Sequence, residues 1–316
     1  MIHTSVPPRV AAAGSAAPPP PLRLAHVRRR DFEPGEAFHA QDREYFSDLA
    51  ASARLPVDET CFGTGRTTYA AMVSALLPEL APYDDDFDLA LLAHATPDST
   101  PGWSMSRLVR STARTGLAFA VSEQGVTSPF AALRMAVEGI PVDGARRALV
   151  LIAEQSAVGH RGPVPEPLRA RHDTAVALVL DASGPLGGLA AEQRTGVEPG
   201  DVSRALTGHL AHLAQSAGGT ERPVLIAGAG LTGSWDGVPE GVDLRTTPPG
   251  MPCAGIWAVL ADELADPRRA ARTVLLAEYD ARFGYLGLCR VDATAQEANA
   301  TAQELDTTAR EGEAHP

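Results

Sequence analysis

The sequence contains no lysine: each of its 27 basic residues is an arginine. The absence of lysine excludes Schiff-base catalysis and the lysine of a phosphate-binding loop. Cysteine is scarce, with three residues far apart and no Cys-x-x-Cys pair. This pattern indicates neither a zinc site nor a disulfide framework, and we expect no metal and no cofactor. No apolar run is long enough to span a bilayer, so no membrane partner is expected.

The charge balance narrows the partners further. The net charge is −12, which argues against binding to nucleic acid or to an anionic membrane. With 44% hydrophobic and 21% charged residues over 316 positions, the chain is expected to bury a sizeable core. The N-terminal residues are rich in proline and alanine and make a poor signal peptide, so a cytoplasmic location is expected.

Short apolar runs alternate with segments of helical pattern along the chain. Runs of this length that are bounded by turn residues are typical of strands buried on both faces. The expected strands are residues 88–94, 117–121, 148–153, 174–180, 224–227 and 273–277. The expected helices are residues 67–80, 128–138, 202–217 and 254–265. The alternation predicts crossover units and a layered α/β architecture.

A cluster of glycine and proline near residues 160–172 predicts a boundary between two halves. The predicted organisation is a disordered tail over residues 1–21, an N-terminal half over 22–160 and a C-terminal half over 161–293. A flexible acidic tail over residues 294–316 completes it.

Several of these segments, in this order, resemble the ketosynthase III group of the thiolase superfamily. Similar features are the run that ends in a Thr-x-Asp turn, the strand and helix around a nucleophile turn, and a strand that ends in Ala-Glu. A further strand and a closing hairpin follow. The segments are residues 87–98, 118–133, 146–154, 173–180 and 274–285. The resemblance implies a thiolase-like layered αβαβα fold with two related halves.

Enzymes of this family carry a cysteine at the tip of a strand-turn-helix, where the helix N-terminus favours the thiolate. Counting forward from Val121 places this position at Gly125, whereas counting back from Leu133 places it at Val126. Gln124 is the adjacent candidate. None of the three is a nucleophile, so the resemblance implies that the usual cysteine is missing.

The two other catalytic residues of the family also lack counterparts. The family histidine follows a strand that resembles residues 224–226, where this chain continues Ala-Gly-Ala-Gly. The family asparagine follows a glycine that resembles Gly250, where this chain continues with Met251. The loss of all three residues is better explained by relaxed selection on catalysis than by a change of chemistry.

Chain length factors of type II polyketide synthases resemble ketosynthases, lack the cysteine and often carry glutamine there. The resemblance therefore implies a non-catalytic subunit of a polyketide or fatty-acid-type synthase. Such a subunit pairs with an active ketosynthase, shapes the acyl-chain tunnel, and meets an acyl carrier protein through that partner. The side chains expected to line the tunnel or the subunit interface are Phe119, Phe130, Met251 and Trp257.

Two alternatives stay open. One is an acyltransferase or ketosynthase III-like enzyme with a displaced nucleophile, for which Ser128 and Cys253 are the candidates. Ser128 precedes a proline and also suits a helix N-cap, while Cys253 also suits an inert buried position. The other alternative is a homodimeric protein that binds acyl chains without a partner. His209 and His212 lie three residues apart on an expected helix, which is weak metal-ligand spacing without a third ligand.

Overall fold

The computed structural model describes residues 21–292, apart from 84–85, 101–103, 113, 139–145, 158, 160–161, 163–165, 216–221, 232–233 and 267–271. The two tails expected from the sequence lie outside these residues, save for residue 21. In the part of the chain that is described, no helix is both long and apolar enough to cross a membrane.

Ten of the twelve strands form one sheet in the order β10-β9-β11-β12-β8-β1-β7-β6-β4-β5. The strands are β1 Arg23–Phe32, β4 Asp86–Ala93, β5 Arg114–Val121, β6 Arg147–Glu154, β7 Asp173–Asp181, β8 Gly187–Arg194, β9 Val224–Ala227, β10 Asp243–Thr246, β11 Thr273–Asp280 and β12 Tyr285–Asp292. The helices are α1 Ala40–Ser52, α2 Tyr69–Leu76, α3 Ser104–Ser111, α4 Ser128–Glu138, α5 Val202–Gln215 and α6 Gly255–Ala265.

The strand order repeats. The first half runs β5-β4-β6-β7-β1 and the second runs β10-β9-β11-β12-β8. When the five strands of each half are numbered along the chain, both halves have the order 3-2-4-5-1. In each half one strand runs antiparallel to the others: β7 in the first half and β12 in the second. A short antiparallel pairing of β1 with β8, at Arg23 opposite Gly188, joins the halves. The predicted limits at residues 160 and 161 stay a prediction, because one continuous sheet marks no separate domains.

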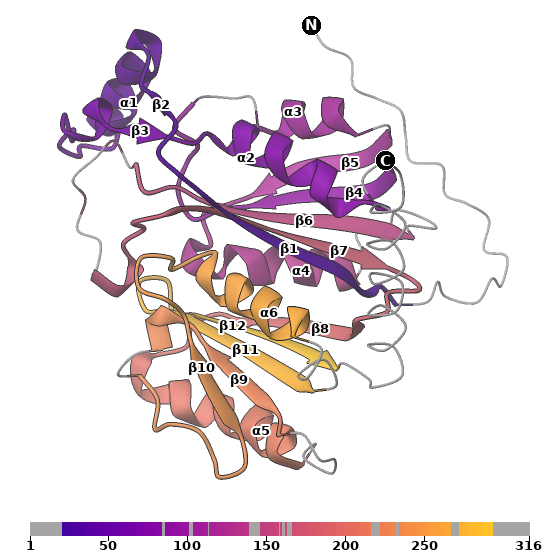
Figure 1. Cartoon of the computed structure of the whole chain (residues 1–316). Helices are drawn as coiled ribbons and strands as arrows, with labels where there is room; N and C mark the ends of the chain where they lie inside the picture. The colour runs from indigo at the N-terminus through magenta and orange to yellow at the C-terminus, as the bar shows by residue number, and fades with distance from the viewer. Residues whose placement is uncertain are drawn as a thin grey trace, which may run out of the picture.

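The helices and strands are stacked in five layers (Figure 1). Three apolar cores fill the spaces between these layers. Successive side chains of a strand point to opposite faces of its sheet. In β7, Val176 and Leu178 therefore face the central core, whereas Ala177 and Val179 face the outer core under α2. The central core encloses α4 and α6, and a third core lies under α5. The predicted αβαβα arrangement is confirmed.

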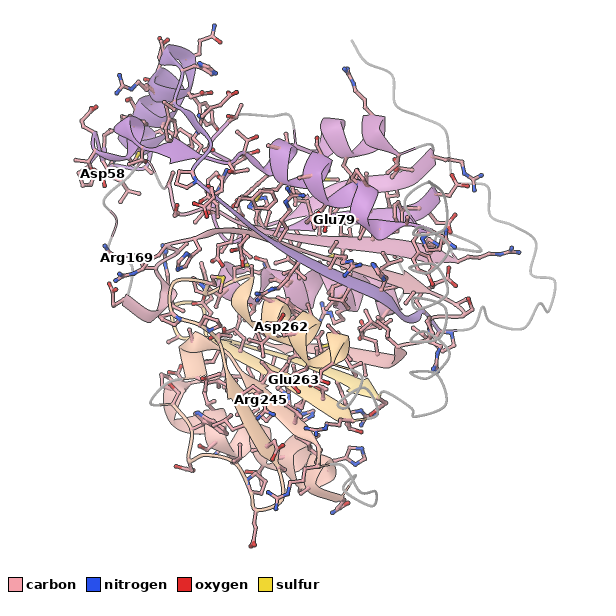
Figure 2. All side chains as sticks on the ribbon, in the orientation of Figure 1. Asp58, Glu79, Arg169, Arg245, Asp262 and Glu263 are labelled. Carbon is pink, nitrogen blue, oxygen red and sulfur yellow. The ribbon has the colours of Figure 1, made fainter. Side chains whose placement is uncertain are left out.

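The central helix α6 is tied to strands of both halves by ion pairs at its outer end. Arg29 of β1 lies 3.0 Å from Asp262, and Arg245 of β10 lies 2.7 Å from the buried Glu263. Figure 2 shows Arg245, Asp262 and Glu263 gathered on this side of the molecule. Partly exposed ion pairs contribute little to the free energy of folding, so these two pairs help to position α6 without accounting for its stability.

The second half has a thinner outer layer than the first. In the first half α2 and α3 both cover the outer face, but between β9 and β10 the described residues form only a 3-10 turn at Ala229–Leu231. The segment between these strands has five glycines and a proline, which disfavour a helix. Its apolar residues, among them Leu231 and Trp235, cover the sheet instead.

A small excursion between β1 and α2 forms α1 and the two-stranded ribbon of β2, Glu36–Ala37, and β3, Gly65–Arg66. It has its own apolar cluster around Phe38, Phe46 and Phe62. Arg66 lies over the Phe38 ring at 4.2 Å and pairs with the buried Asp42 at 2.6 Å. In Figure 1 this excursion projects from the edge of the layered body.

Candidate functional site

The turn between β5 and α4 is the place where the sequence predicts the lost nucleophile. Its backbone is unusual, because Glu123 and Gly125 both have positive φ, of 63° and 56°. Left-handed backbone is costly for residues other than glycine, so Glu123 is held in a strained conformation. The turn continues as a 3-10 segment, Gly125–Thr127, into α4. Its geometry is therefore that of a sharp strand-to-helix elbow.

The carboxylate of Asp280, at the end of β11, occupies the space in front of this elbow. Its Oδ2 accepts a hydrogen bond from the backbone N–H of Val126 at 3.1 Å. Its Oδ1 accepts from the N–H groups of Arg282 and Phe283 at 3.0 and 3.4 Å. A Cβ atom built on Gly125 would fall on the Asp280 carboxylate, with the Phe283 ring also in contact. No side chain fits at residue 125 while Asp280 keeps this position.

The electrostatics of the elbow follow from the same contact. The N-terminus of a helix attracts negative charge because its first N–H groups have no partner within the helix. Here Asp280 supplies that charge from within the chain and is buried, with 3% of its surface exposed. Asp280 therefore already occupies the N–H side of the 3-10 turn that leads into α4.

A second buried carboxyl group, that of Glu278, packs against the backbone that follows β9, where the sequence predicts the lost histidine. Glu278 accepts a hydrogen bond through Oε1 from the Gly230 N–H at 2.9 Å and another from the Tyr279 N–H at 2.9 Å. A Cβ atom on Gly228 would fall on the Glu278 carboxyl group. The Oε2 atom of Glu278 is fully buried and has no hydrogen-bond partner among the described residues.

A third carboxyl group, Glu154 at the end of β6, caps the second central helix. Its two oxygens accept hydrogen bonds from the N–H groups of Cys253 and Ala254 at 2.9 and 3.0 Å. Met251, at the position predicted for the family asparagine, is buried and receives a hydrogen bond from Thr174 at 3.3 Å. The only asparagine in the sequence is at position 299, outside the described residues.

Burial shifts the titration of two of these groups. Removal from water raises the pKa of Glu154 from 4.5 to about 7, against the effect of its two backbone donors. Burial likewise raises the pKa of Glu278 from 4.5 to about 8, with the neighbouring Asp280 adding to the rise. At pH 7 a carboxyl group with a pKa of about 8 is largely protonated, whereas one with a pKa of about 7 is about half protonated. Glu278 is then a hydrogen-bond donor as well as an acceptor.

Gln124 and Ser128, two of the sequence candidates, are bound within the elbow. The Gln124 side chain accepts a hydrogen bond from Gln193 of β8 at 3.3 Å, and its backbone carbonyl accepts from Thr127 at 2.7 Å. Ser128 is fully buried and donates to the Gly125 carbonyl at 2.8 Å. The expectation that Ser128 is the N-cap of α4 is wrong, because the 3-10 segment precedes it and Asp280 binds the first free N–H.

Cys253, the other displaced-nucleophile candidate, lies just before α6 and is fully buried. Burial, together with the nearby Glu154 and Glu278, raises the pKa of the Cys253 thiol well above its usual value. The thiolate is the reactive form of cysteine, so this environment makes Cys253 a poor nucleophile.

We expect Cys253 to resist alkylation by iodoacetamide in the folded chain. Its alkylation rate should be far lower in the folded chain than in the chain unfolded in urea, because burial raises the pKa of the thiol and also shields the sulfur from the reagent. Peptide mapping by mass spectrometry after timed quenching measures both rates in one sample. Rapid, stoichiometric labelling of Cys253 at pH 7.5 without denaturant would return it to the list of nucleophiles.

The expected tunnel or interface residues lie in or beside the central layer. Phe130 of α4 and Trp257 of α6 are fully buried, with ring centroids 4.9 Å apart. Phe119 of β5 is partly buried against the same core, and Met251 is buried beside Thr174. Phe130 and Trp257 fill the space between the two central helices. A role for these side chains in a tunnel stays a prediction.

Metal binding finds little support in the geometry. Among the described residues, no group of three or more histidine, cysteine, aspartate or glutamate side chains has an arrangement that could hold a metal ion. His209 and His212 both lie on α5, as expected, and line a hollow on the outer face described below.

Asp280 and Glu278 were missed as site residues by sequence reasoning, and Glu154 was noted only as part of a strand motif. Their shared signal is a carboxyl group at the end of an otherwise apolar strand. Both β6 and β11 continue an apolar run into such a residue. A buried carboxylate at a strand end requires backbone donors, and helix N-termini supply them.

Comparison with known proteins finds similar structures but no match by sequence. No family model matches the chain, and no curated protein matches it by sequence. The structure is similar to ChlB3, an acyltransferase, at a TM-score of 0.54 and 15% identity, covering 88% of this chain and 99% of that one. It is similar to the priming β-ketosynthase of the R1128 polyketide pathway at a TM-score of 0.52 and 15% identity, covering 89% and 99%.

A third similar structure is 3-oxoacyl-(acyl carrier protein) synthase III from Pseudomonas aeruginosa, at a TM-score of 0.51 and 15% identity, covering 87% and 98%. At these identities the likeness establishes the fold. The chain therefore has the thiolase-like fold of ketosynthase III-type proteins, as the sequence resemblance implies.

Proposed function

We propose that this chain is a non-catalytic, ketosynthase-like subunit of a polyketide or fatty-acid-type synthase. The observation that carries the proposal is the Asp280 carboxylate, which takes the place of a side chain at Gly125 and binds the N–H of Val126 in the turn that leads into α4. The Glu278 carboxyl group closes the Gly228 position in the same way. A condensing reaction of the ketosynthase kind needs a reactive side chain at the elbow, but Gly125 has no side chain, Asp280 takes the space for one, and the buried Ser128 hydroxyl is bound to the Gly125 carbonyl.

The proposal includes a partner, an active ketosynthase that carries the cysteine and receives the acyl carrier protein. The edge strand β5 supports this part of the proposal. All of its residues except Val121 are at least partly exposed, and Leu117 is 39% exposed. Next to it on α3, Val109 is 45% exposed. An edge strand with exposed apolar side chains is a template for pairing with another chain.

We expect the chain to form a stable mixed dimer when it is co-expressed with a cysteine-bearing ketosynthase of the same biosynthetic system. Size-exclusion chromatography with light scattering, followed by native mass spectrometry, identifies the composition of the species. A homodimer formed in preference to the mixed dimer would favour the alternative of an acyl-binding protein without a partner. Recovery of separate monomers would contradict the subunit assignment.

Leu117→Asp should remove the mixed dimer, because it places a charge on the pairing edge. Leu244→Asp is a matched control, since Leu244 is also 39% exposed and lies on β10, the opposite edge of the sheet. Circular dichroism of the isolated variants confirms that both fold. Loss of pairing with Leu244→Asp and not with Leu117→Asp would place the interface on the other edge.

A further inference from the structure

The outer face of the second half carries a groove between α5 and the strands β8 and β12. Three adjoining hollows of about 410, 540 and 580 Å³ form it. The first two share His209, His212 and Arg290, and the last two share Arg194 and Arg204. We call this continuous depression the α5 groove. Its position follows from the thinner outer layer of this half, where α5 covers the sheet without a second helix.

Basic side chains dominate the middle of the α5 groove. In the middle hollow every charged or titratable residue of the wall is arginine or histidine, namely Arg194, Arg204, His209, His212 and Arg290. Acidic residues lie toward the ends, with Glu138 and Glu192 in the first hollow and Asp201 in the last. A negatively charged group in the middle hollow therefore meets arginine and histidine side chains, with the Glu192 carboxylate beside them, 2.6 Å from Arg194 and 3.5 Å from His209.

Ion pairs fix the arginines without using all of their donors. Arg204 lies 2.9 Å from Asp201 through one terminal nitrogen. Arg290 lies 3.0 Å from Asp292 through Nε, and its two terminal nitrogens have no partner among the described residues. A guanidinium held in this way keeps a pair of donors in the geometry that binds carboxylate or phosphate.

His209 lies between opposite charges and can change its role. Its Nε2 is 3.0 Å from the Arg194 terminal nitrogen and 3.5 Å from the Glu192 carboxylate. Arginine only donates, so this Nε2 accepts and the ring is neutral in the pair with Arg194. Burial lowers the pKa of His209, and the positive charges of Arg194, Arg290 and His212 lower it further, against the effect of Glu192. An added anion would reverse that balance.

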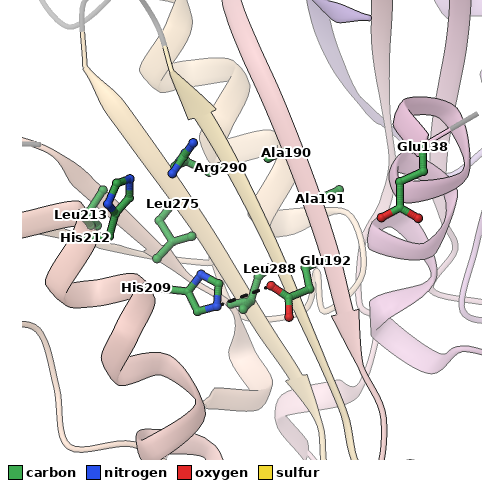
Figure 3. Close-up of a pocket in the computed structure, with 10 residues that line it drawn as sticks. All are labelled: Glu138, Ala190, Ala191, Glu192, His209, His212, Leu213, Leu275, Leu288 and Arg290. Atoms are coloured by element: carbon green, nitrogen blue, oxygen red, sulfur yellow. Dashed lines mark ion pairs between the residues drawn. The ribbon is translucent and has the colours of Figure 1, made fainter. Parts of the chain in front are cut away.

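The first hollow adds an apolar floor to these donors. Leu213, Leu275 and Leu288 lie beneath the polar side chains, with Ala190 and Ala191 beside them. Figure 3 shows Leu275 between Arg290 and His209, and Leu288 beside the dashed line from His209 to Glu192, with Glu138 on a separate helix. The groove therefore offers guanidinium donors, each from an arginine that is also paired with an acid, and a short hydrophobic surface next to them.

We propose that the α5 groove is a binding site for a small organic anion, with its carboxylate or phosphate at Arg290 and Arg204 and a short apolar body over Leu275 and Leu288. Such a ligand matches both surfaces, whereas inorganic ions use only the first. The site is separate from the elbow at Gly125 and does not depend on the proposed function.

Isothermal titration calorimetry with hexanoate and its neutral counterpart hexanamide tests this proposal on the full chain. Hexanoate should bind at millimolar concentration and clearly more tightly than hexanamide. Arg290→Gln should weaken hexanoate binding about tenfold, through loss of a charge-assisted pair. Arg30→Gln is the matched control, because Arg30 is also a strand arginine paired with an acid, at 2.7 Å from Glu79, and lies outside the groove.

A second readout on the same samples is the NMR titration of His209. A carboxylate bound beside His209 should raise the pKa of this histidine, against the positive charges of Arg194, Arg290 and His212. The acidic Glu192 and Glu138 of the same groove are present in both the free and the bound chain, so the change in pKa reports the ligand. Equal binding of hexanoate and hexanamide, an unaffected Arg290→Gln variant, or no saturable binding at millimolar hexanoate would each overturn the proposal. Phosphate that competes with hexanoate supports the anion site, and hexanoate binding that phosphate does not reduce contradicts it.

Discussion

Replacing Gly125 with cysteine, at one of the three positions where the sequence predicts the missing nucleophile, should destabilise the folded chain by about 3–5 kcal/mol. Two effects add up in this number. The new Cβ would fall on the Asp280 carboxylate, and the residue would have to keep a φ of 56°. Urea unfolding followed by circular dichroism measures the change in the free energy of unfolding.

Gly196→Cys separates the two effects. Gly196 has a φ of 70°, but no atom lies within 4 Å of a Cβ built there. It should therefore show only the cost of left-handed backbone, about 1–2 kcal/mol. Equal destabilisation by both substitutions would mean that Asp280 does not fill the elbow.

Removal of Asp280 should relieve the clash. Asp280→Gly alone costs stability because it leaves the Val126 N–H without its partner. On that background Gly125→Cys should cost less than it does in the unmodified chain, by about 1–3 kcal/mol of coupling. Additive effects in this double-mutant cycle would contradict the direct contact between the two positions.

Stability should fall as the pH rises from 7 to 8, by about 1 kcal/mol, because of Glu278. Its pKa is about 8 in the folded chain and 4.5 in its ordinary state, so the folded chain keeps a proton that the unfolded chain has lost. Unfolding releases that proton, and raising the pH favours unfolding until the folded pKa is passed. Glu154, with a pKa of about 7, contributes mainly below this window.

Glu278→Gln should flatten the pH dependence between 7 and 8, because an amide keeps the hydrogen bonds without titrating. The window avoids the histidines with lowered pKa, which change charge at lower pH. Glu44→Gln, at an exposed position on α1, is the matched control and should leave the slope unchanged. If the free energy of unfolding of Glu278→Gln still fell as steeply between pH 7 and 8, Glu278 would not be the group that holds the proton.

Most of the layered fold could be predicted because buried elements carry local signals. The apolar runs at residues 148–153 and 174–180 became β6 and β7, and the helix expected at 128–138 is α4 with the same bounds. The helix expected over residues 67–80 is α-helical only over Tyr69–Leu76 and continues as a 3-10 turn to Leu80. Strand β1 was missed because one of its faces is partly exposed and carries Arg28 and Arg30 in place of an apolar run.

The filled elbow could not be predicted, since it depends on contacts between distant segments. Val126 and Asp280 are 154 residues apart, and no local pattern indicates that β11 ends in front of α4. The sequence did show that Gly125 could not be a nucleophile. Only the structure explains why a substitution there would be resisted, and only it brings Glu154 to the start of α6.

Intact-protein mass spectrometry of the purified chain, incubated alone with an acyl-thioester, tests the central claim most directly. The account predicts an unchanged mass, because the elbow holds a carboxylate in place of a nucleophile and Cys253 is buried as a thiol. A cysteine-bearing ketosynthase treated in parallel should gain one acyl group. A stoichiometric acyl adduct on this chain, located by peptide mapping, would contradict the non-catalytic assignment and identify the residue that acts.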